Sequence, residues 1–404
     1  MNICIIGKDD YNVYNGTSSG LASEYTAFSP ANHDIYLLSK GLTIFEGCVV
    51  EVVLHHTFSC WEEVDVVDVL DPNVYNVIGL DLSSSSNEIV EFLKDNEEVY
   101  DVFIFYDMKM LSIFKDHNIK TNAKLIYRSM YDDCNPANGF YGLNVFDKLS
   151  CVDAVAVNTK FSKDWYQNYF CDKKSPTDKK PPVDFDKVFV WSYSYDVADR
   201  AIFNQDENLP KEINICISNL ADRDQKSVIV SSIIKVLENQ PKDLVFDVGL
   251  HLSSVNTILN NIVLTSKRWE NLKLCAESFY SIKARNEIFS KSDIFISMWK
   301  AGTSAGDIFT CEAANNGCLI IAAATPDLYE TFEEFKFFNQ SDFENKLSLA
   351  LSVVTSNHNK KMLEKVLKSE AVEQRKMFIN NSIQSQIEYV YKCIRDVVYS
   401  FNKE

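Results

Sequence analysis

A strand, a loop of small residues, a helix and a second strand follow one another between Ser290 and Ala324. The sequence predicts buried strands over Asp293–Met298 and Cys318–Ala324, and the helix between them carries Glu312. The loop is rich in Gly, Ser and Thr, so no bulky side chain covers the backbone N–H groups at the start of the helix. Because such a helix N-terminus is suited to binding a phosphate, the segment predicts a nucleotide-linked substrate.

Two short apolar runs echo each other: Asn2–Ile6 reads NICII and Ile213–Ile217 reads INICI. Each run suits a strand that is covered on both faces, and each is followed by a polar loop and a candidate helix. Alternating strands and helices predict two α/β domains, each with a doubly wound parallel sheet. Further strands are expected at Asp34–Leu38, Val49–Leu54, Asp101–Tyr106, Lys124–Tyr127, Asp153–Val157, Leu244–Val248 and Leu272–Cys275.

Helices are expected after Ser85-Ser86-Asn87-Glu88, over Ser227–Glu238 and Ser281–Ser290, and in the tail Met362–Phe401. The polar stretch Asp196–Pro210 is the expected domain boundary. We therefore divide the chain into domains at 1–200 and 208–375, with a C-terminal helix at 376–404 packing back on the first domain.

The net charge of −17 argues against broad binding to nucleic acid or anionic membranes, which a basic surface favours. Eleven scattered cysteines, with no C-x-x-C pair, suit a reducing compartment. The opening MNICIIG lacks the basic and apolar regions of a signal peptide, and no apolar run has the length of a membrane span. We expect a cytoplasmic protein, located in the host cytoplasm if the chain is viral.

Several segments, in this order, resemble retaining glycosyltransferases of the two-domain GT-B fold. Asp293–Ile296 with Cys311–Ala322 resembles their donor-site signature, in which a helical Glu-Ala and a Gly precede a strand that ends in Ala. Ile213–Lys226 is similar to the strand and basic loop that open the donor domain, and Asp153–Trp165 to the last strand and helix of the acceptor domain. The pattern resembles glycosyltransferase family 4 and phage DNA α-glucosyltransferase-like enzymes. The resemblance implies two Rossmann-like domains that face a cleft, with the acceptor bound by the N-terminal domain and the nucleotide sugar by the C-terminal one.

The resemblance also implies roles for particular residues. A departing diphosphate needs fixed donors, which Lys226 and Arg223 would supply, and a carboxylate such as Glu312 suits the two ribose hydroxyls. The full expected donor set is Glu312, Lys226, Arg223, Thr303, Ser304, Gly306, Gly16 and Thr17, and the expected acceptor set is Asp132, Asp133 and Arg128.

No protein nucleophile or base is assigned, because the leaving phosphate can accept the acceptor's proton. The histidines, His251 among them, show no metal-ligand spacing, and the resemblance implies neither a metal nor a cofactor besides the nucleotide-sugar co-substrate, such as a UDP-sugar.

Two departures from the family pattern leave alternatives open. Ser304 stands where the family often has a glutamate eight positions before Glu312, and Ser218-Asn219-Leu220 stands where it usually has Gly-Arg-Leu. The first hypothesis is transfer of a sugar to a hydroxyl of a glycan, lipid-linked glycan or protein. The second is the same chemistry on hydroxymethylated bases of viral DNA, and the third is an inert protein that binds sugar nucleotides or acts as a scaffold.

Overall fold

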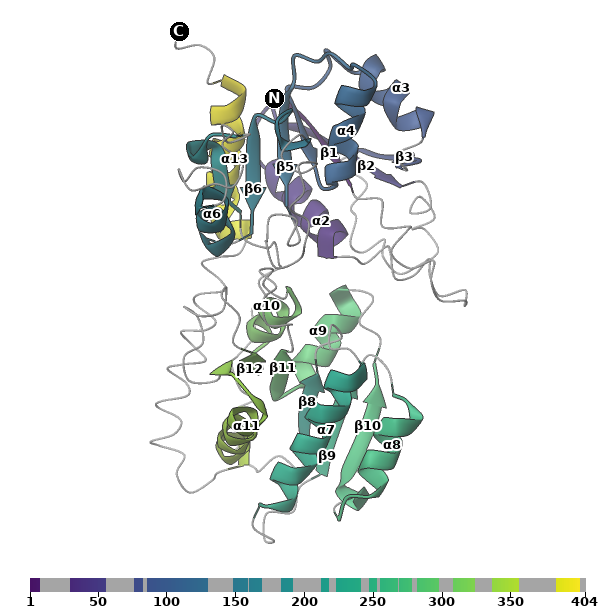
Figure 1. Cartoon of the computed structure of the whole chain (residues 1–404), viewed down its shortest axis with the longest axis vertical. Coiled ribbons are helices and arrows are strands. Elements are labelled where there is room, and N and C mark those ends of the chain that lie inside the picture. The colour runs from purple at the N-terminus through teal and green to yellow at the C-terminus, as the bar shows by residue number, and fades with distance from the viewer. Residues whose placement is uncertain are drawn as a thin grey trace. The chain divides into compact units, whose positions relative to one another are not determined.

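The computed structural model (Figure 1) describes sixteen segments of the chain. They are residues 1–7, 30–55, 76–82, 86–129, 148–158, 160–168, 183–191, 212–217, 223–240, 247–252, 255–267, 269–277, 282–297, 308–323, 336–355 and 383–399. The described residues up to 191 form one compact unit together with the C-terminal helix, and those from 212 to 355 form another. The expected boundary at Asp196–Pro210 lies outside the described residues.

Unit 1 is built on a seven-stranded parallel sheet of order β3-β2-β1-β4-β5-β6-β7. Its strands are β1 (Asn2–Ile6), β2 (Val49–His55), β3 (Asn76–Leu80), β4 (Val102–Phe105), β5 (Lys124–Arg128), β6 (Ala154–Val157) and β7 (Val188–Val190). Its helices are α2 (Pro30–Leu42), α3 (Asn87–Asp95), α4 (Met108–Asp116), α6 (Lys160–Tyr166) and α13 (Ile383–Tyr399), with a 3-10 turn η7 at Phe185–Lys187.

Unit 2 repeats this design with a six-stranded parallel sheet of order β10-β9-β8-β11-β12-β13. Its strands are β8 (Glu212–Ile217), β9 (Asp247–Leu252), β10 (Leu272–Ala276), β11 (Ile294–Ser297), β12 (Leu319–Ala323) and β13 (Lys336–Phe337). Its helices are α7 (Arg223–Glu238), α8 (Thr257–Leu264), α9 (Ile282–Lys291), α10 (Ile308–Asn315) and α11 (Gln340–Thr355), with a 3-10 turn η8 at Trp269–Asn271. The fold class expected from the sequence, two doubly wound parallel-sheet domains, is confirmed.

The central strands form because their side chains are apolar on both faces. All four residues of β4 (VFIF) and of β6 (AVAV) are buried, as in parallel sheets that helices cover on both sides. The echo noted in the sequence has a structural meaning, since β1 and β8 occupy equivalent central places in their sheets. Each lies between the strand that follows it in sequence and a strand reached by a crossover, β4 or β11.

One expected strand is wrong. Asp34–Leu38 lies inside helix α2, which begins at Pro30. The apolar run DIYLL suits a strand by itself, but the buried residues Ile35, Leu38 and Leu42 recur at helical spacing. Proline is also favoured in the first turn of a helix, where its missing N–H has no cost.

Helix α13 packs on α2 within unit 1. The rings of Phe45 and Tyr391 stack with their centroids 4.0 Å apart. A Cβ atom at Gly41 would lie 2.7 Å from Ile387 Cδ1 and 2.9 Å from its Cγ1, so the glycine is what lets the two helices approach. The C-terminal helix is thus fixed to unit 1 by shape as well as by apolar contact.

Among the described residues, no helix combines the length and the apolar character that crossing a membrane requires.

The contact at Gly41 predicts a stability effect. Gly41→Val should lower the free energy of unfolding by about 1–3 kcal/mol, because the new methyl groups collide with Ile387. Adding Ile387→Ala should remove part of that loss, so the two changes should be non-additive in urea denaturation. Lys40→Val, at an exposed neighbour on the same helix, is the control and should change stability by about 0.5 kcal/mol or less. Additive effects of Gly41→Val and Ile387→Ala would contradict the proposed contact.

Candidate functional site

The switch point of the unit 2 sheet lies between β8 and β11. At such a point the connections leave in opposite directions, and ligands of open α/β sheets bind at the carboxyl ends of the strands there. The loops that follow these two strands are residues 218–222 and 298–307. They lie outside the described residues, and with them lie Thr303, Ser304 and Gly306 of the expected donor set. The elements that bound them are described, so the small-residue loop runs from the end of β11 to the start of α10.

Helix α10 is fixed at both of its ends. Near its start, Thr310 Oγ1 donates a hydrogen bond of 2.8 Å to Ser297 Oγ, at the last residue of β11. After its end, Gly317 has a φ of +90°, and the N–H groups of Gly317 and Cys318 donate to Ala314 O and Ala313 O. A left-handed glycine of this kind ends a helix at low cost, so the chain turns directly into β12.

Glu312 lies on α10 in a buried ion pair with Arg285 of α9. Arg285 Nε donates to Oε2 at 2.7 Å and Nη2 donates to Oε1 at 2.9 Å, which is a two-pronged arrangement. The two side chains are only 3% and 4% exposed, and the guanidinium carbon lies 5.2 Å from the centre of the Phe309 ring. The sequence analysis missed Arg285, which is 27 residues away on another helix. The ion pair holds the Glu312 carboxylate in one orientation, with both of its oxygens accepting hydrogen bonds from Arg285. The assignment of Glu312 to the ribose hydroxyls stays a prediction.

Lys226 and Arg223 lie in the first turn of α7, directly after the loop that follows β8. The structure describes the backbone of Arg223 and places the side chain of Lys226 in a largely buried setting, with 6% of the residue exposed. The place of Lys226, at a helix N-terminus near the switch point, suits the phosphate role that the sequence predicts, which stays a prediction.

The switch point of unit 1 lies between β1 and β4. Gly7 follows β1 directly, and a Cβ atom there would lie 2.8 Å from Leu54 Cδ2 and 3.3 Å from Val53 O. The chain therefore passes close over β2 as it enters the loop of residues 8–29. That loop, which contains Gly16 and Thr17, lies outside the described residues, as do Asp132 and Asp133.

Arg128, expected to contact an acceptor, lies in a buried polar network of unit 1. Its Nε donates to Asp34 Oδ2 at 3.2 Å and its Nη1 to Trp191 O at 2.6 Å, and the residue is 1% exposed. Tyr106 donates to the same Asp34 oxygen at 2.7 Å. Burial, and then the charge of Asp34, raise the pKa of Tyr106 well above its usual value, so this hydroxyl stays protonated as a donor. In this geometry Arg128 joins β5 to α2 and the end of β7, and contact with an acceptor would require the packing to change.

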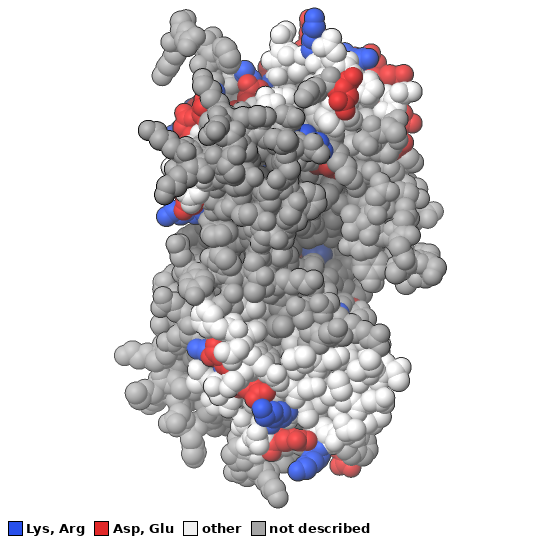
Figure 2. Space-filling model, in the orientation of Figure 1, with Lys and Arg blue, Asp and Glu red and all other residues white. Residues whose placement is uncertain are grey.

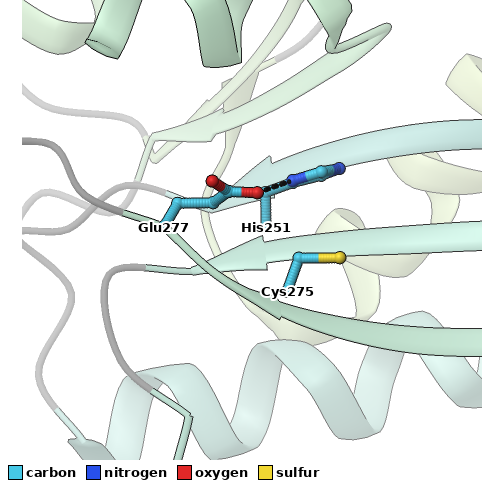
Figure 3. A group of neighbouring side chains, drawn as sticks. All are labelled: His251, Cys275 and Glu277. Carbon is cyan, nitrogen blue, oxygen red and sulfur yellow. Dashed lines mark hydrogen bonds and ion pairs between the residues drawn. The ribbon is translucent and has the colours of Figure 1, made fainter.

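One group of side chains of metal-ligand type lies together in the part of the chain that the structure describes. It consists of His251, Cys275 and Glu277 in unit 2 (Figure 3). These residues are 24 and 26 positions apart in sequence and come from neighbouring strands, so no local spacing in the sequence indicated them.

Neither a protein-family model nor a curated protein matches this chain in sequence. Solved structures do match its fold. The structure of Anabaena Alr3699/HepE in complex with UDP has a TM-score of 0.63 at 11% identity, with 97% of this chain and 100% of that chain covered. The E. coli trehalose-6-phosphate structure bound with UDP-2-fluoro glucose has a TM-score of 0.58 at 11% identity, with coverages of 98% and 99%. The pneumococcal O-GlcNAc transferase GtfA in complex with UDP and GlcNAc has a TM-score of 0.53 at 14% identity, with coverages of 77% and 60%. At these identities the likeness shows the fold alone, and the fold agrees with the two-domain GT-B class that the sequence resemblance implied.

The buried pair of Arg128 and Asp34 predicts a large stability effect. Arg128→Met should destabilise the protein by about 3–5 kcal/mol, because it leaves the Asp34 carboxylate buried without its cation. Adding Asp34→Leu should recover much of that loss, since a buried pair can often be replaced by apolar side chains. The matched control is Lys124→Met, at the other end of β5, whose partly exposed pair with Asp153 should contribute about 1 kcal/mol or less. Equal effects of the two single changes in urea denaturation would contradict this assignment.

Proposed function

We propose that this chain is a glycosyltransferase that moves a sugar from a nucleotide-diphosphate sugar, such as a UDP-sugar, to a hydroxyl acceptor. We further propose that the reaction retains the configuration of the sugar and needs no metal ion. The fold supports the proposal, because structures in complex with UDP, UDP-2-fluoro glucose, or UDP and GlcNAc share it.

The observation that carries the proposal is the arrangement at the β8–β11 switch point of unit 2. A loop rich in Gly, Ser and Thr leads there into α10, and Lys226, with its side chain largely buried, lies in the first turn of α7, the helix that comes after the neighbouring strand β8. A helix N-terminus preceded by small residues offers N–H groups to a phosphate, and a nearby lysine adds a positive charge. These are the elements that a diphosphate requires.

The chemistry follows from where charge develops. Breaking the bond between the sugar and the diphosphate leaves negative charge on the leaving phosphate, and fixed donors stabilise that charge more in the transition state than in the ground state. Lys226, Arg223 and the N–H groups near Thr303 are the proposed donors. Glu312, oriented by Arg285, is proposed to hold the ribose, and the leaving phosphate accepts the proton of the acceptor hydroxyl.

The acceptor is proposed to bind unit 1, at the carboxyl ends of its strands, where Asp132 and Asp133 follow β5 in sequence. The loop with Gly16 and Thr17 follows β1 at the switch point of the same sheet, and we propose that it contacts the donor. The class of acceptor is a hydroxyl compound, for which saccharides and protein side chains are the first substrates to examine.

The direct test incubates the purified full chain with UDP-glucose, UDP-GlcNAc and other nucleotide sugars, first alone and then with a panel of hydroxyl acceptors. Release of UDP and formation of a product with the anomeric configuration of the donor, read by NMR, are the expected results. Activity should survive treatment with EDTA. A product of inverted configuration would contradict the retaining mechanism. Binding of a nucleotide without any turnover would favour the third hypothesis, an inert sugar-nucleotide-binding protein, which Ser304 in place of the family's glutamate leaves open.

Transfer to bases of viral DNA has weaker support. On the face drawn in Figure 2, the Lys and Arg side chains of the described residues are interspersed with Asp and Glu, and the net charge of the chain is −17. Duplex binding depends on basic residues that neutralise phosphates and thereby release the counterions condensed on the DNA. Such binding should weaken steeply as the salt concentration rises. Retention of hydroxymethylated duplex DNA at low salt, with transfer of sugar to it, would reverse this preference.

The phosphate role of Lys226 gives a sharp binding prediction. Lys226→Met should weaken binding of UDP by about ten- to a hundredfold, because it removes a charge-assisted hydrogen bond to the diphosphate. Lys235→Met is the matched control, since Lys235 lies on the same helix in a surface ion pair with Glu344. In isothermal titration the control should bind UDP with the wild-type dissociation constant. Both variants should bind uridine, which lacks the diphosphate, with the same affinity. A Lys226→Met variant that binds UDP as tightly as the control would remove Lys226 from the donor site.

A further inference from the structure

The sheet of unit 2 has one apolar face and one face that is partly polar. Alternate residues of β8 and β9, such as Ile215 and Leu250, are buried in a cluster with the apolar residues of α7, α8 and α11. Side chains alternate between the two faces of a strand, so Asn214 and His251 lie on the opposite face. Parallel sheets usually carry apolar residues on both faces, so polar groups at this place call for an explanation.

His251, Cys275 and Glu277 converge on that opposite face (Figure 3). His251 and Cys275 are partners in the parallel register of β9 and β10, so their side chains leave the sheet on the same side. Glu277 follows β10 directly, and its N–H donates to Leu252 O at 2.8 Å, which prolongs the strand pairing by one residue. One nitrogen, one sulfur and one oxygen atom of the three side chains thereby lie within 4.8 Å of one another.

Asn214 orients the imidazole of His251. His251 Nε2 lies 2.9 Å from Asn214 Oδ1, an acceptor, and this contact favours the tautomer in which Nε2 carries the hydrogen and Nδ1 has a lone pair for a metal ion. Nδ1 in turn lies 2.6 Å from Glu277 Oε1, another acceptor. Two acceptors at this separation repel each other unless a proton lies between them, and a metal ion that replaces this proton has to move the two atoms apart.

Gly249 makes this arrangement of Asn214 and His251 sterically feasible. A Cβ atom at position 249 would lie 2.6 Å from Asn214 Oδ1 and 3.0 Å from His251 Nε2. Any side chain there would displace the hydrogen bond that orients the imidazole. A second residue that orients a histidine in this way is a usual feature of metal sites in proteins.

We propose that His251 Nδ1, Cys275 Sγ and Glu277 Oε1 form a binding site for a divalent metal ion of the zinc class. Imidazole, thiolate and carboxylate are the three kinds of ligand that Zn²⁺ takes in proteins, and the sulfur selects against Mg²⁺ and Ca²⁺. Three protein ligands leave a fourth, tetrahedral position for water. The His251 and Glu277 side chains are 14% and 27% exposed, which gives an ion access from solvent.

Binding requires small changes in the side chains. Bond lengths of about 2.0–2.3 Å put neighbouring ligand atoms of a tetrahedral zinc site roughly 3.3–3.8 Å apart. The ion therefore separates Glu277 from His251, and the sulfur of Cys275 moves inward. The thiol loses its proton to solvent as the Zn–S bond forms. The ion would join the carboxyl ends of β9 and β10, and it is separate from the metal-independent transfer proposed at the β8–β11 switch point.

Cobalt is the probe for this site, because Co²⁺ takes the same ligands as Zn²⁺ and absorbs light when it is bound to a thiolate. The full chain, freed of metal with a chelator, should bind one equivalent of Co²⁺ with a thiolate-to-cobalt charge-transfer band, and Zn²⁺ should abolish that band. Cys275→Ser should remove the band. His251→Gln and Glu277→Gln should each weaken binding about tenfold or more, and Asn214→Ala by about ten- to a hundredfold, because it frees the imidazole to rotate.

The controls are Cys48→Ser, at a half-buried thiol of unit 1, and His117→Gln, at an exposed histidine, and both should bind as the wild type does. Glu277→Gln keeps the shape of the side chain, so it tests the site even if Cys275→Ser folds poorly. Two results would overturn the proposal. One is a wild-type protein that shows no thiolate band, in which case a proton lies between His251 and Glu277. The other is a band that persists in Cys275→Ser.

Discussion

The buried ion pair between Arg285 and Glu312 holds together the part of unit 2 on which the proposed chemistry depends. Ionised groups taken out of water are costly unless they are paired with good geometry, and here both carboxylate oxygens receive a hydrogen bond from one guanidinium. The pair connects α9 to α10. The start of α10 thus has a defined place beside the end of β11, which the bond from Thr310 to Ser297 reinforces.

A comparable pair occurs in unit 1. Arg128 and Asp34 join the last residue of β5 to helix α2, and Tyr106 and the carbonyl of Trp191 complete the set of partners. In both units a buried arginine thus ties a helix to elements near the carboxyl ends of the strands. Buried polar networks that are fully bonded favour one packing over others, so both pairs give the loops at these ends a rigid base. The loops themselves are where an α/β fold of this class binds its ligands.

Much of the fold could be predicted from the sequence because its central strands are short and apolar on both faces, which is a local signal. NICII, DVFIFY and DAVAV each correspond to a strand at nearly the expected place. The signal failed at DIYLL, because a short apolar run is compatible with either a strand or a helix. Here the packing of α2 in unit 1 makes it helical. It also missed β3, NVIGL, in which an asparagine and a glycine interrupt the apolar pattern.

The candidate sites were less accessible to sequence reasoning, because their partners are distant in the chain. The sequence indicated Glu312 from its helix and its small neighbours, but only the packing of α9 on α10 reveals Arg285. Likewise Arg128 has the character of a binding residue in sequence, and it is the fold that brings Asp34 to it. His251, Cys275 and Glu277 show no ligand spacing along the chain, and the parallel register of β9 and β10 brings them together.

Hydrogen exchange with and without UDP, read by mass spectrometry, tests the central claim most directly. The claim is that a nucleoside diphosphate binds at the loop that leads into α10, over a base fixed by Arg285 and Glu312. It predicts that UDP slows exchange in the peptides that cover the start of α10 and the start of α7, while α11 exchanges as before. Unchanged exchange in α10 at UDP concentrations that saturate the protein, or protection confined to α11, would contradict it.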